Sequence, residues 1–179
     1  YSITRESNAT VDKGVIRALN GTLSIKDSVG TGKIAYAQGT SNVGWTIDVK
    51  GEFVLESGII ELTGSWSIGY AVDVRPNSWG TAYTNPTTFT MNGGSIVSSD
   101  GAVRVASSSA SEHKKVSASF EMNGGTIESD LNPVRVYGPA PTGYVNDEDC
   151  MNIKLLGGTM TYTGTETQTW GVEGILRVG

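Results

Sequence analysis

Short triplets with an apolar residue on each side of a variable one recur along the chain and set its pattern. The clearest are Phe89-Thr90-Met91 and Phe120-Glu121-Met122, and Phe53-Val54-Leu55 precedes them. An alternation with a period of two residues is typical of a β-strand that buries one face. In the two clearest copies Asn-Gly-Gly follows the triplet. Asn and Gly accept positive φ most readily, so we predict a sharp corner at this point.

Each triplet belongs to a longer unit that repeats. The segment 89–96 returns almost unchanged as 120–127, and weaker copies occupy 53–60 and 153–160. The copies begin about 31 to 36 residues apart, a period typical of stacked repeat architectures. The apolar residue after each corner begins a predicted second strand, and these residues are Ile60, Ile96, Ile127 and Met160.

A third strand is predicted in each unit, with a charged or variable residue between two apolar ones. Its copies are 15–18, 46–49, 71–74, 102–105, 133–136 and 175–178. The segments 21–25 and 32–34 supply an early first and second strand. The sequence therefore predicts six copies of the third strand and five of the first. In the first strands we expect two buried stacks, one of Phe53, Phe89 and Phe120 and one of Leu55, Met91, Met122 and Leu155.

Three short strands per repeat, separated by corners, predict an all-β parallel β-helix, a solenoid of about six coils. Leucine-rich repeats require a Leu/Asn ladder and a shorter period, and helical repeats require a 3.6-residue periodicity. A β-propeller blade has a similar period, and Asn-Gly between two strands also occurs in hairpins. The strand after Asn-Gly-Gly is too short and polar to mirror the strand before it, which favours the parallel β-helix.

The repeated Met-Asn-Gly-Gly-Thr-Ile motif and the segment 21–34 resemble right-handed parallel β-helix proteins of the pectate-lyase-like type. They look most like repeat regions of surface proteins from Gram-positive gut bacteria and of virion proteins from their phages. The resemblance covers about residues 14–179 and implies the fold. That fold carries lyases, hydrolases, adhesins and phage fibres alike, so function has to be argued from the site.

The repeats predict one β-helix domain over residues 14–179, with residues 1–13 as an N-terminal cap or partial coil. At the other end, the apolar strand 175–178 is the last copy of its kind. Exposed strand edges tend to pair with other strands. We therefore expect this edge to meet a continuation of the chain, a second copy in a homo-oligomer, or a larger particle.

Composition excludes several classes of function. The net charge is −5, whereas a nucleic-acid partner normally requires a basic stripe. No apolar run is long enough to span a membrane, so we expect no membrane insertion. The single cysteine, Cys150, excludes an internal disulfide framework.

Long connections supply the candidate binding residues. The predicted third and first strands are joined by short connections at 19–22 and 50–52, and by much longer ones at 75–88, 106–119 and 137–152. Insertions on one flank of a repeat protein often form its binding face. Exposed Trp and Tyr rings stack on sugars or anchor protein partners. The candidates on these connections are Trp79, Tyr83, Tyr137 and Tyr144, and another set of corners supplies Trp66 and Trp170. The alternative is that these rings fold over the flanks and serve only packing.

The middle residues of the third strands form a predicted column of charges: Arg17, Asp48, Asp73, Arg104, Arg135 and Arg177. Because strand side chains alternate, we expect these charges to point outward. In a lyase, Asp48 and Asp73 would bind a metal and Arg104 would act as the base. The interpretation we favour is a surface ladder in which Asp73 pairs with Arg104 and each exposed pair contributes about 0–1 kcal/mol.

Other candidate chemistry is sparse. Glycoside hydrolysis needs two facing carboxylates, and Glu61 and Glu128 occupy like positions about two strands apart. The acidic run 146–149 lacks the spacing of a known calcium loop. His113 is the only histidine, and Cys150 has no nearby base in the sequence. We therefore predict no cofactor, no metal and no catalytic residue.

The sequence favours a non-catalytic structural or adhesive module. We expect it to be extracellular, on a phage virion as a decoration or fibre protein or on a bacterial surface. Its partner would be a surface glycan or a protein, bound through the long connections. The alternative is a polysaccharide lyase or glycoside hydrolase.

Overall fold

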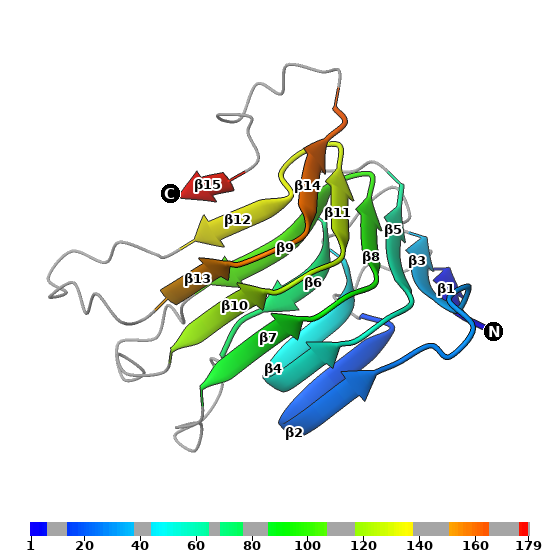
Figure 1. Ribbon diagram of the computed structural model, residues 1–179, viewed down its shortest axis with the longest axis horizontal. Helices are drawn as coiled ribbons and strands as arrows, with labels where there is room; N and C mark the ends of the chain where they lie inside the picture. The colour runs from blue at the N-terminus through cyan, green and yellow to red at the C-terminus, as the bar shows by residue number, and fades with distance from the viewer. Residues whose placement is uncertain are drawn as a thin grey trace, which may run out of the picture.

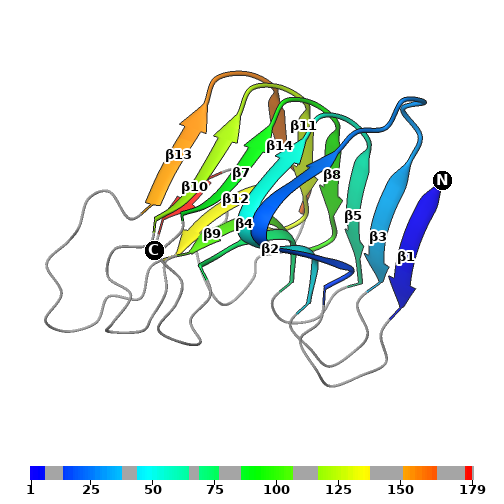
Figure 2. The same ribbon diagram turned by 90° about the horizontal axis from the view of Figure 1, so that it is seen from below.

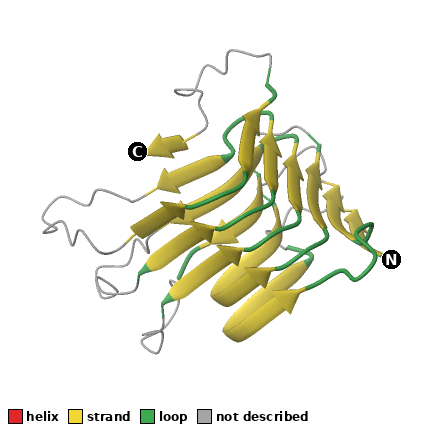
Figure 3. Ribbon diagram, in the orientation of Figure 1, coloured by secondary structure: helices red, strands yellow, loops and turns green. Residues whose placement is uncertain are grey.

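The computed structural model describes residues 1–6, 14–37, 44–64, 69–76, 86–106, 117–137, 151–164 and 176–178. This part of the chain contains strands, turns and bends, and no helix (Figure 3). The strands are β1 (Ser2–Glu6), β2 (Ile16–Ile25), β3 (Lys33–Ala37), β4 (Trp45–Leu55), β5 (Ile59–Thr63), β6 (Tyr70–Val74), β7 (Thr87–Met91), β8 (Ser95–Ser98), β9 (Gly101–Ala106), β10 (Ala118–Met122), β11 (Thr126–Ser129), β12 (Val134–Tyr137), β13 (Met151–Leu155), β14 (Thr159–Tyr162) and β15 (Leu176–Val178).

The strands form two parallel sheets. The six-stranded sheet has the order β1-β3-β5-β8-β11-β14. The nine-stranded sheet has the order β13-β10-β7-β4-β6-β9-β12-β15, with β2 also pairing with β4. The nine-stranded sheet folds back on itself, and the six-stranded sheet lies across its open side (Figures 1 and 2).

This arrangement overturns the predicted solenoid of about six coils with three short strands per coil. We expected corners at 19–22 and 50–52, but both stretches lie inside long strands, β2 of 10 residues and β4 of 11 residues. One end of β4 pairs with β6 and the other end pairs with β7. The predicted first and third strands are thereby joined into a single sheet, so the chain has two sheets rather than three.

Very short connections explain the continuous strands. A register shift between Leu19 and Thr22 marks a β-bulge in β2, where Asn20 has a φ of 50°. Such a bulge bends a strand without ending it. A Cβ on Gly51 would lie 2.7 Å from the Gly21 oxygen, so the two backbones approach closely where the sheet bends.

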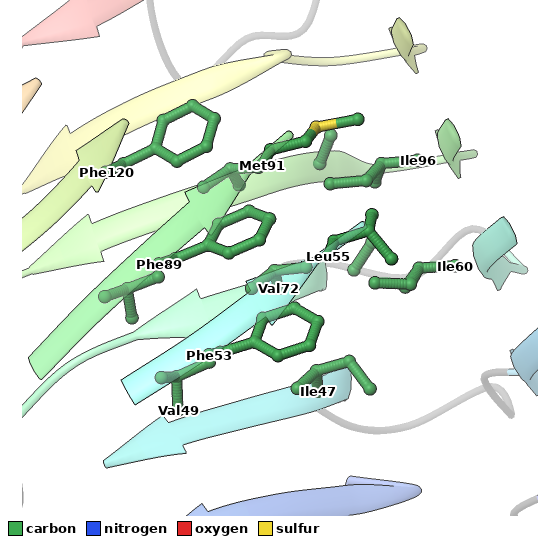
Figure 4. Packing of buried hydrophobic residues seen from close by; sticks show 14 of the residues in the cluster. Ile47, Val49, Phe53, Leu55, Ile60, Val72, Phe89, Met91, Ile96 and Phe120 are labelled. Carbon is green, nitrogen blue, oxygen red and sulfur yellow. The ribbon is translucent and has the colours of Figure 1, made fainter. Parts of the chain in front are cut away.

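The core lies between the two sheets, and its side chains are stacked in columns. Strand pairing aligns Phe53, Phe89 and Phe120. Their ring centroids are 4.8 and 4.9 Å apart, with interplanar angles of 15° and 17°. All three are at most 1% exposed, which confirms the predicted stack (Figure 4).

The next inward column aligns Leu55, Met91, Met122 and Leu155. The first three are buried as predicted, but Leu155 is 46% exposed. It belongs to β13, which pairs with β10 on one side and has no strand on its other side among the described residues. The prediction that Leu155 is buried is therefore wrong.

The Asn-Gly-Gly corners behave as predicted. Gly94 and Gly125 have φ values of 79° and 88°, a region that other L-residues rarely adopt. The corners also stack closely, because a Cβ on Gly94 would lie 2.7 Å from the Gly58 oxygen. At the same corner, Asn123 Nδ2 donates to Asn92 Oδ1 at 3.0 Å.

Candidate functional site

The charged column brings several ionisable side chains together in the nine-stranded sheet. Strand pairing places its members in one row across β2, β4, β6, β9, β12 and β15, in the predicted order Arg17, Asp48, Asp73, Arg104, Arg135 and Arg177. The register was therefore predicted correctly.

The predicted exposure of this column is wrong at its centre. Asp48 is 1% exposed and Asp73 is 0% exposed, and the Arg104 side chain is 13% exposed. A buried charge is costly unless it is paired and hydrogen-bonded. The centre of the column is therefore a buried network, whereas the Arg17 side chain at one end is 50% exposed.

Asp73 is held by two arginines. Arg104 Nε and NH2 donate to Asp73 Oδ1 and Oδ2, both at 2.7 Å, and Arg75 NH2 lies 3.6 Å from Oδ2. Burial alone would raise the pKa of Asp73, but the Arg104 hydrogen bonds and charge, with the charges of Arg75 and Lys50, hold it below the usual value. This carboxylate is already neutralised by protein cations.

Asp48 is neutralised in the same way. Arg17 Nε donates to Oδ2 at 2.7 Å, and Lys50 Nζ lies 2.9 Å from Oδ1 as an ion pair. The Lys50 side chain is 8% exposed. Burial lowers the pKa of Lys50, and the charges of Asp73 and Asp48 partly oppose that shift.

Two aromatic rings extend the network. Arg104 Cζ lies 4.7 Å from the Tyr70 ring centroid and 5.8 Å from the Trp45 ring centroid, within cation–π range. Arg135 NH1 donates to Tyr70 Oη at 2.7 Å. Tyr70 aligns with Gly101 in the neighbouring strand, and a Cβ there would lie 2.5 Å from the Tyr70 ring. The ring therefore occupies space that only glycine leaves open.

This geometry does not support the metal-dependent lyase interpretation. Among the described residues, no group of three or more His, Cys, Asp or Glu side chains could hold a metal ion. Asp48 and Asp73 are paired with cations, and the Arg104 guanidinium is engaged with Asp73. The network can fix strand order and rigidity, and its two aspartates are already paired with protein cations.

The two glutamates considered for glycoside hydrolysis lie in one column of the six-stranded sheet. Glu61 aligns with Val97, and Val97 aligns with Glu128, so the predicted spacing is confirmed. Their environments differ, because Lys33 Nζ lies 2.8 Å from Glu61 Oε2. Glu128 forms no hydrogen bond or ion pair with the described residues.

Five of the six aromatic binding candidates lie outside the described residues: Trp66, Trp79, Tyr83, Tyr144 and Trp170. Tyr137 ends β12, and its backbone aligns with Ala106 of β9. Their role in binding therefore stays a prediction. His113, Cys150 and the acidic run 146–149 also lie outside the described residues.

Sequence reasoning missed Lys50, Arg75 and Asp100. Asp100 is 8% exposed and its carboxylate accepts hydrogen bonds from the Gly69 and Gly101 amides. Burial raises its pKa, and these hydrogen bonds partly oppose the rise. A signal was present for Lys50 and Arg75, because both follow a third-strand copy directly and supply a cation next to a predicted column of charges.

Comparison with known proteins gave no relatives. No protein-family model, no curated protein and no solved structure matches this chain. Within the described residues no helix could span a membrane.

Proposed function

We propose that this chain is a non-catalytic structural or adhesive module displayed on a phage virion or a bacterial surface. Its long connections bind a glycan or a protein. The observation that carries the proposal is the strand order: β6, β9 and β12 are neighbours, and so are β7, β10 and β13. The three long connections start and return at matching ends of parallel strands, so their attachment points form two rows along one flank.

The rest of the described structure supports a scaffold role. The core contains a column of stacked rings, and the buried carboxylates of Asp48 and Asp73 are paired with arginine and lysine. Binding residues are often carried on loops held by a rigid framework. A carboxylate already paired with protein cations is a poor metal ligand or general base, which disfavours the lyase alternative at Asp48 and Asp73.

A glycan and protein binding screen tests the proposal. We expect the chain to bind surface polysaccharide or whole cells, and the triple variant W79A/Y83A/Y144A to lose at least tenfold in affinity. The control is Y1A, which removes a fully exposed aromatic ring that is not part of the long connections. If the triple variant kept its affinity, the long connections would not be the binding site. Release of unsaturated products or reducing ends from the bound glycan would replace it with the lyase or hydrolase alternative.

The location can be tested directly. An antibody against the chain should label intact virions or intact cells of the source, and protease treatment of whole particles should remove the label. Labelling only after lysis would contradict surface display.

We also propose that the edge formed by β13 and β14 meets a further strand, from a second copy or a larger assembly. Each of these strands pairs on one side only among the described residues. Leu155 and Leu156 are 46% and 70% exposed there, and unpaired parallel edges are prone to strand addition. Solution mass from light scattering should exceed that of a monomer and fall to it in L155K/L156K.

A further inference from the structure

A hollow of about 240 Å³ opens on the outer face of the six-stranded sheet, where β5, β8, β11 and β14 end. Its lining includes Thr63, Val97, Ser99, Glu128, Asp130 and Thr163. None of its described lining residues belongs to the long connections of the proposed function, so the hollow is treated as a separate site.

Hydrogen bonds to neighbouring groups hold three polar side chains of the hollow, those of Ser99, Asp130 and Thr163. Thr163 Oγ1 donates to Asp130 Oδ1 at 2.6 Å. The Ser99 hydroxyl lies 2.7 Å from the Gly64 oxygen and 3.3 Å from the Leu62 oxygen, and it donates to these carbonyls. These bonds fix the positions of the Ser99 and Thr163 side chains, both of which line the hollow.

The negative charge of the hollow determines which class of ligand it can bind. Glu128 and Asp130 are both exposed, and no lysine, arginine or histidine is among the lining residues. The equivalent glutamate two strands away, Glu61, is paired with Lys33 at 2.8 Å. A ligand here must therefore bring hydrogen-bond donors or a positive charge, and carboxylate or phosphate ligands are repelled.

The hollow also has an apolar floor. Val97 lies between Glu61 and Glu128 in one column and is partly exposed. The volume is below the roughly 300–1,000 Å³ typical of pockets for drug-sized ligands. A small ring with one apolar face and several hydroxyl groups matches this combination.

We propose that this hollow binds a single neutral or amino sugar unit of a glycan, with Glu128 and Asp130 accepting hydrogen bonds from its hydroxyl or ammonium groups. The Ser99 and Thr163 hydroxyls orient the ring, and Val97 contacts its apolar face. The site binds and orients a sugar through hydrogen-bond acceptors, and it does not catalyse a reaction of that sugar.

Isothermal titration with a panel of neutral, amino and uronic acid oligosaccharides tests this proposal. Hydrogen bonds to charged acceptors contribute about tenfold to hundredfold in affinity. We expect E128Q and D130N each to weaken binding of neutral or amino sugars about tenfold, with the amino sugar affected more. The uronic acid oligosaccharide should bind least well to the wild type.

The control is E121Q, which removes a carboxylate of the nine-stranded sheet that lies 3.5 Å from Lys154 and outside the hollow. Equal affinity in E128Q, D130N and E121Q would overturn the proposal, as would absence of sugar binding by the wild type at millimolar concentration. A requirement for calcium, abolished by EDTA, would also overturn it, because the carboxylates would then serve a cation. The variant W79A/Y83A/Y144A leaves the hollow intact, so failure of this site and failure of the proposed function are distinguishable.

Discussion

Arg104 and Asp73 lie in register on neighbouring strands, and the two nitrogens Nε and NH2 of Arg104 each contact a different oxygen of Asp73 at 2.7 Å. Two parallel bonds of this kind add geometric specificity to the charge attraction. The pair lies in the interior, so its removal should matter far more than removal of a surface pair.

The first prediction concerns this pair. Breaking a buried ion pair by removing one partner typically costs about 3–5 kcal/mol, because the remaining charge is left uncompensated. We expect R104M to lower the free energy of unfolding by about this amount, as measured by urea denaturation. The matched control is K154M, which removes the cation from the exposed pair of Lys154 and Glu121 and should cost about 0–1 kcal/mol. Similar losses in both variants would show that Asp73 is not effectively buried.

The second prediction concerns acid stability. The pKa of Asp73 in the folded chain is below its ordinary value of 3.8. The folded state therefore binds fewer protons than the unfolded state, and this contribution is complete above the unfolded pKa and lost as pH falls through the folded pKa. Urea midpoints measured from pH 6 down to pH 2 should fall, and D73N should be less stable at pH 6 with a shallower fall. If the urea midpoint of D73N fell more steeply with decreasing pH than that of the wild type, the pKa of Asp73 would not be lowered in the folded chain.

The third prediction concerns the ring column. F89A should lower the free energy of unfolding by about 3–5 kcal/mol, because it removes a buried ring and leaves a cavity between two others. The neighbouring variant T90A provides the control, since Thr90 points to the opposite face and is partly exposed; it should change stability by less than about 0.5 kcal/mol. A small effect of F89A would mean that the flanking rings close the gap.

The fourth prediction separates backbone strain from crowding at the corners. Gly30 and Gly94 have similar φ values, 84° and 79°. A Cβ on Gly30 would meet nothing within 4 Å, whereas one on Gly94 would lie 2.7 Å from the Gly58 oxygen. G30A should therefore report the cost of left-handed backbone, about 1–2 kcal/mol, and G94A should cost clearly more in the same denaturation assay. Equal costs would show that the stacked corners can move apart.

Much of the local structure could be predicted from the sequence because the repeats impose their own register. Once Phe89 and Phe120 are recognised as equivalent, the pairing of every flanking residue follows, including Asp73 with Arg104. The sheet organisation could not be read in this way. Whether 19–22 and 50–52 turn a corner or continue a strand depends on the bulge at Asn20 and the close approach of Gly51 to Gly21.

The burial of Asp48 and Asp73 could not be predicted from the alternation of inward and outward side chains along a strand. That rule assigns Asp48 and Asp73 to the face away from Ile47 and Val72, which is correct, but it cannot tell whether that face is covered. Trp45, Tyr70 and the stems of Lys50 and Arg104 lie around these carboxylates. The hollow beside Glu128 could not be predicted from the sequence either, because its lining comes from the ends of four strands that are far apart in sequence.

The fit of Tyr70 against Gly101 has a consequence for how the chain assembles. The repeats that contain Phe89 and Phe120 are so alike that either could stack on the strand containing Phe53 with little loss of core contact. Gly101 distinguishes them, because the residue at the same place in the following repeat, two before Val134 as Gly101 is two before Val103, is Asn132. Its Cβ would enter the space of the Tyr70 ring. We therefore expect the contact between Tyr70 and Gly101 to disfavour a fold in which the two repeats exchange places, at a position where the hydrophobic core alone would tolerate the exchange.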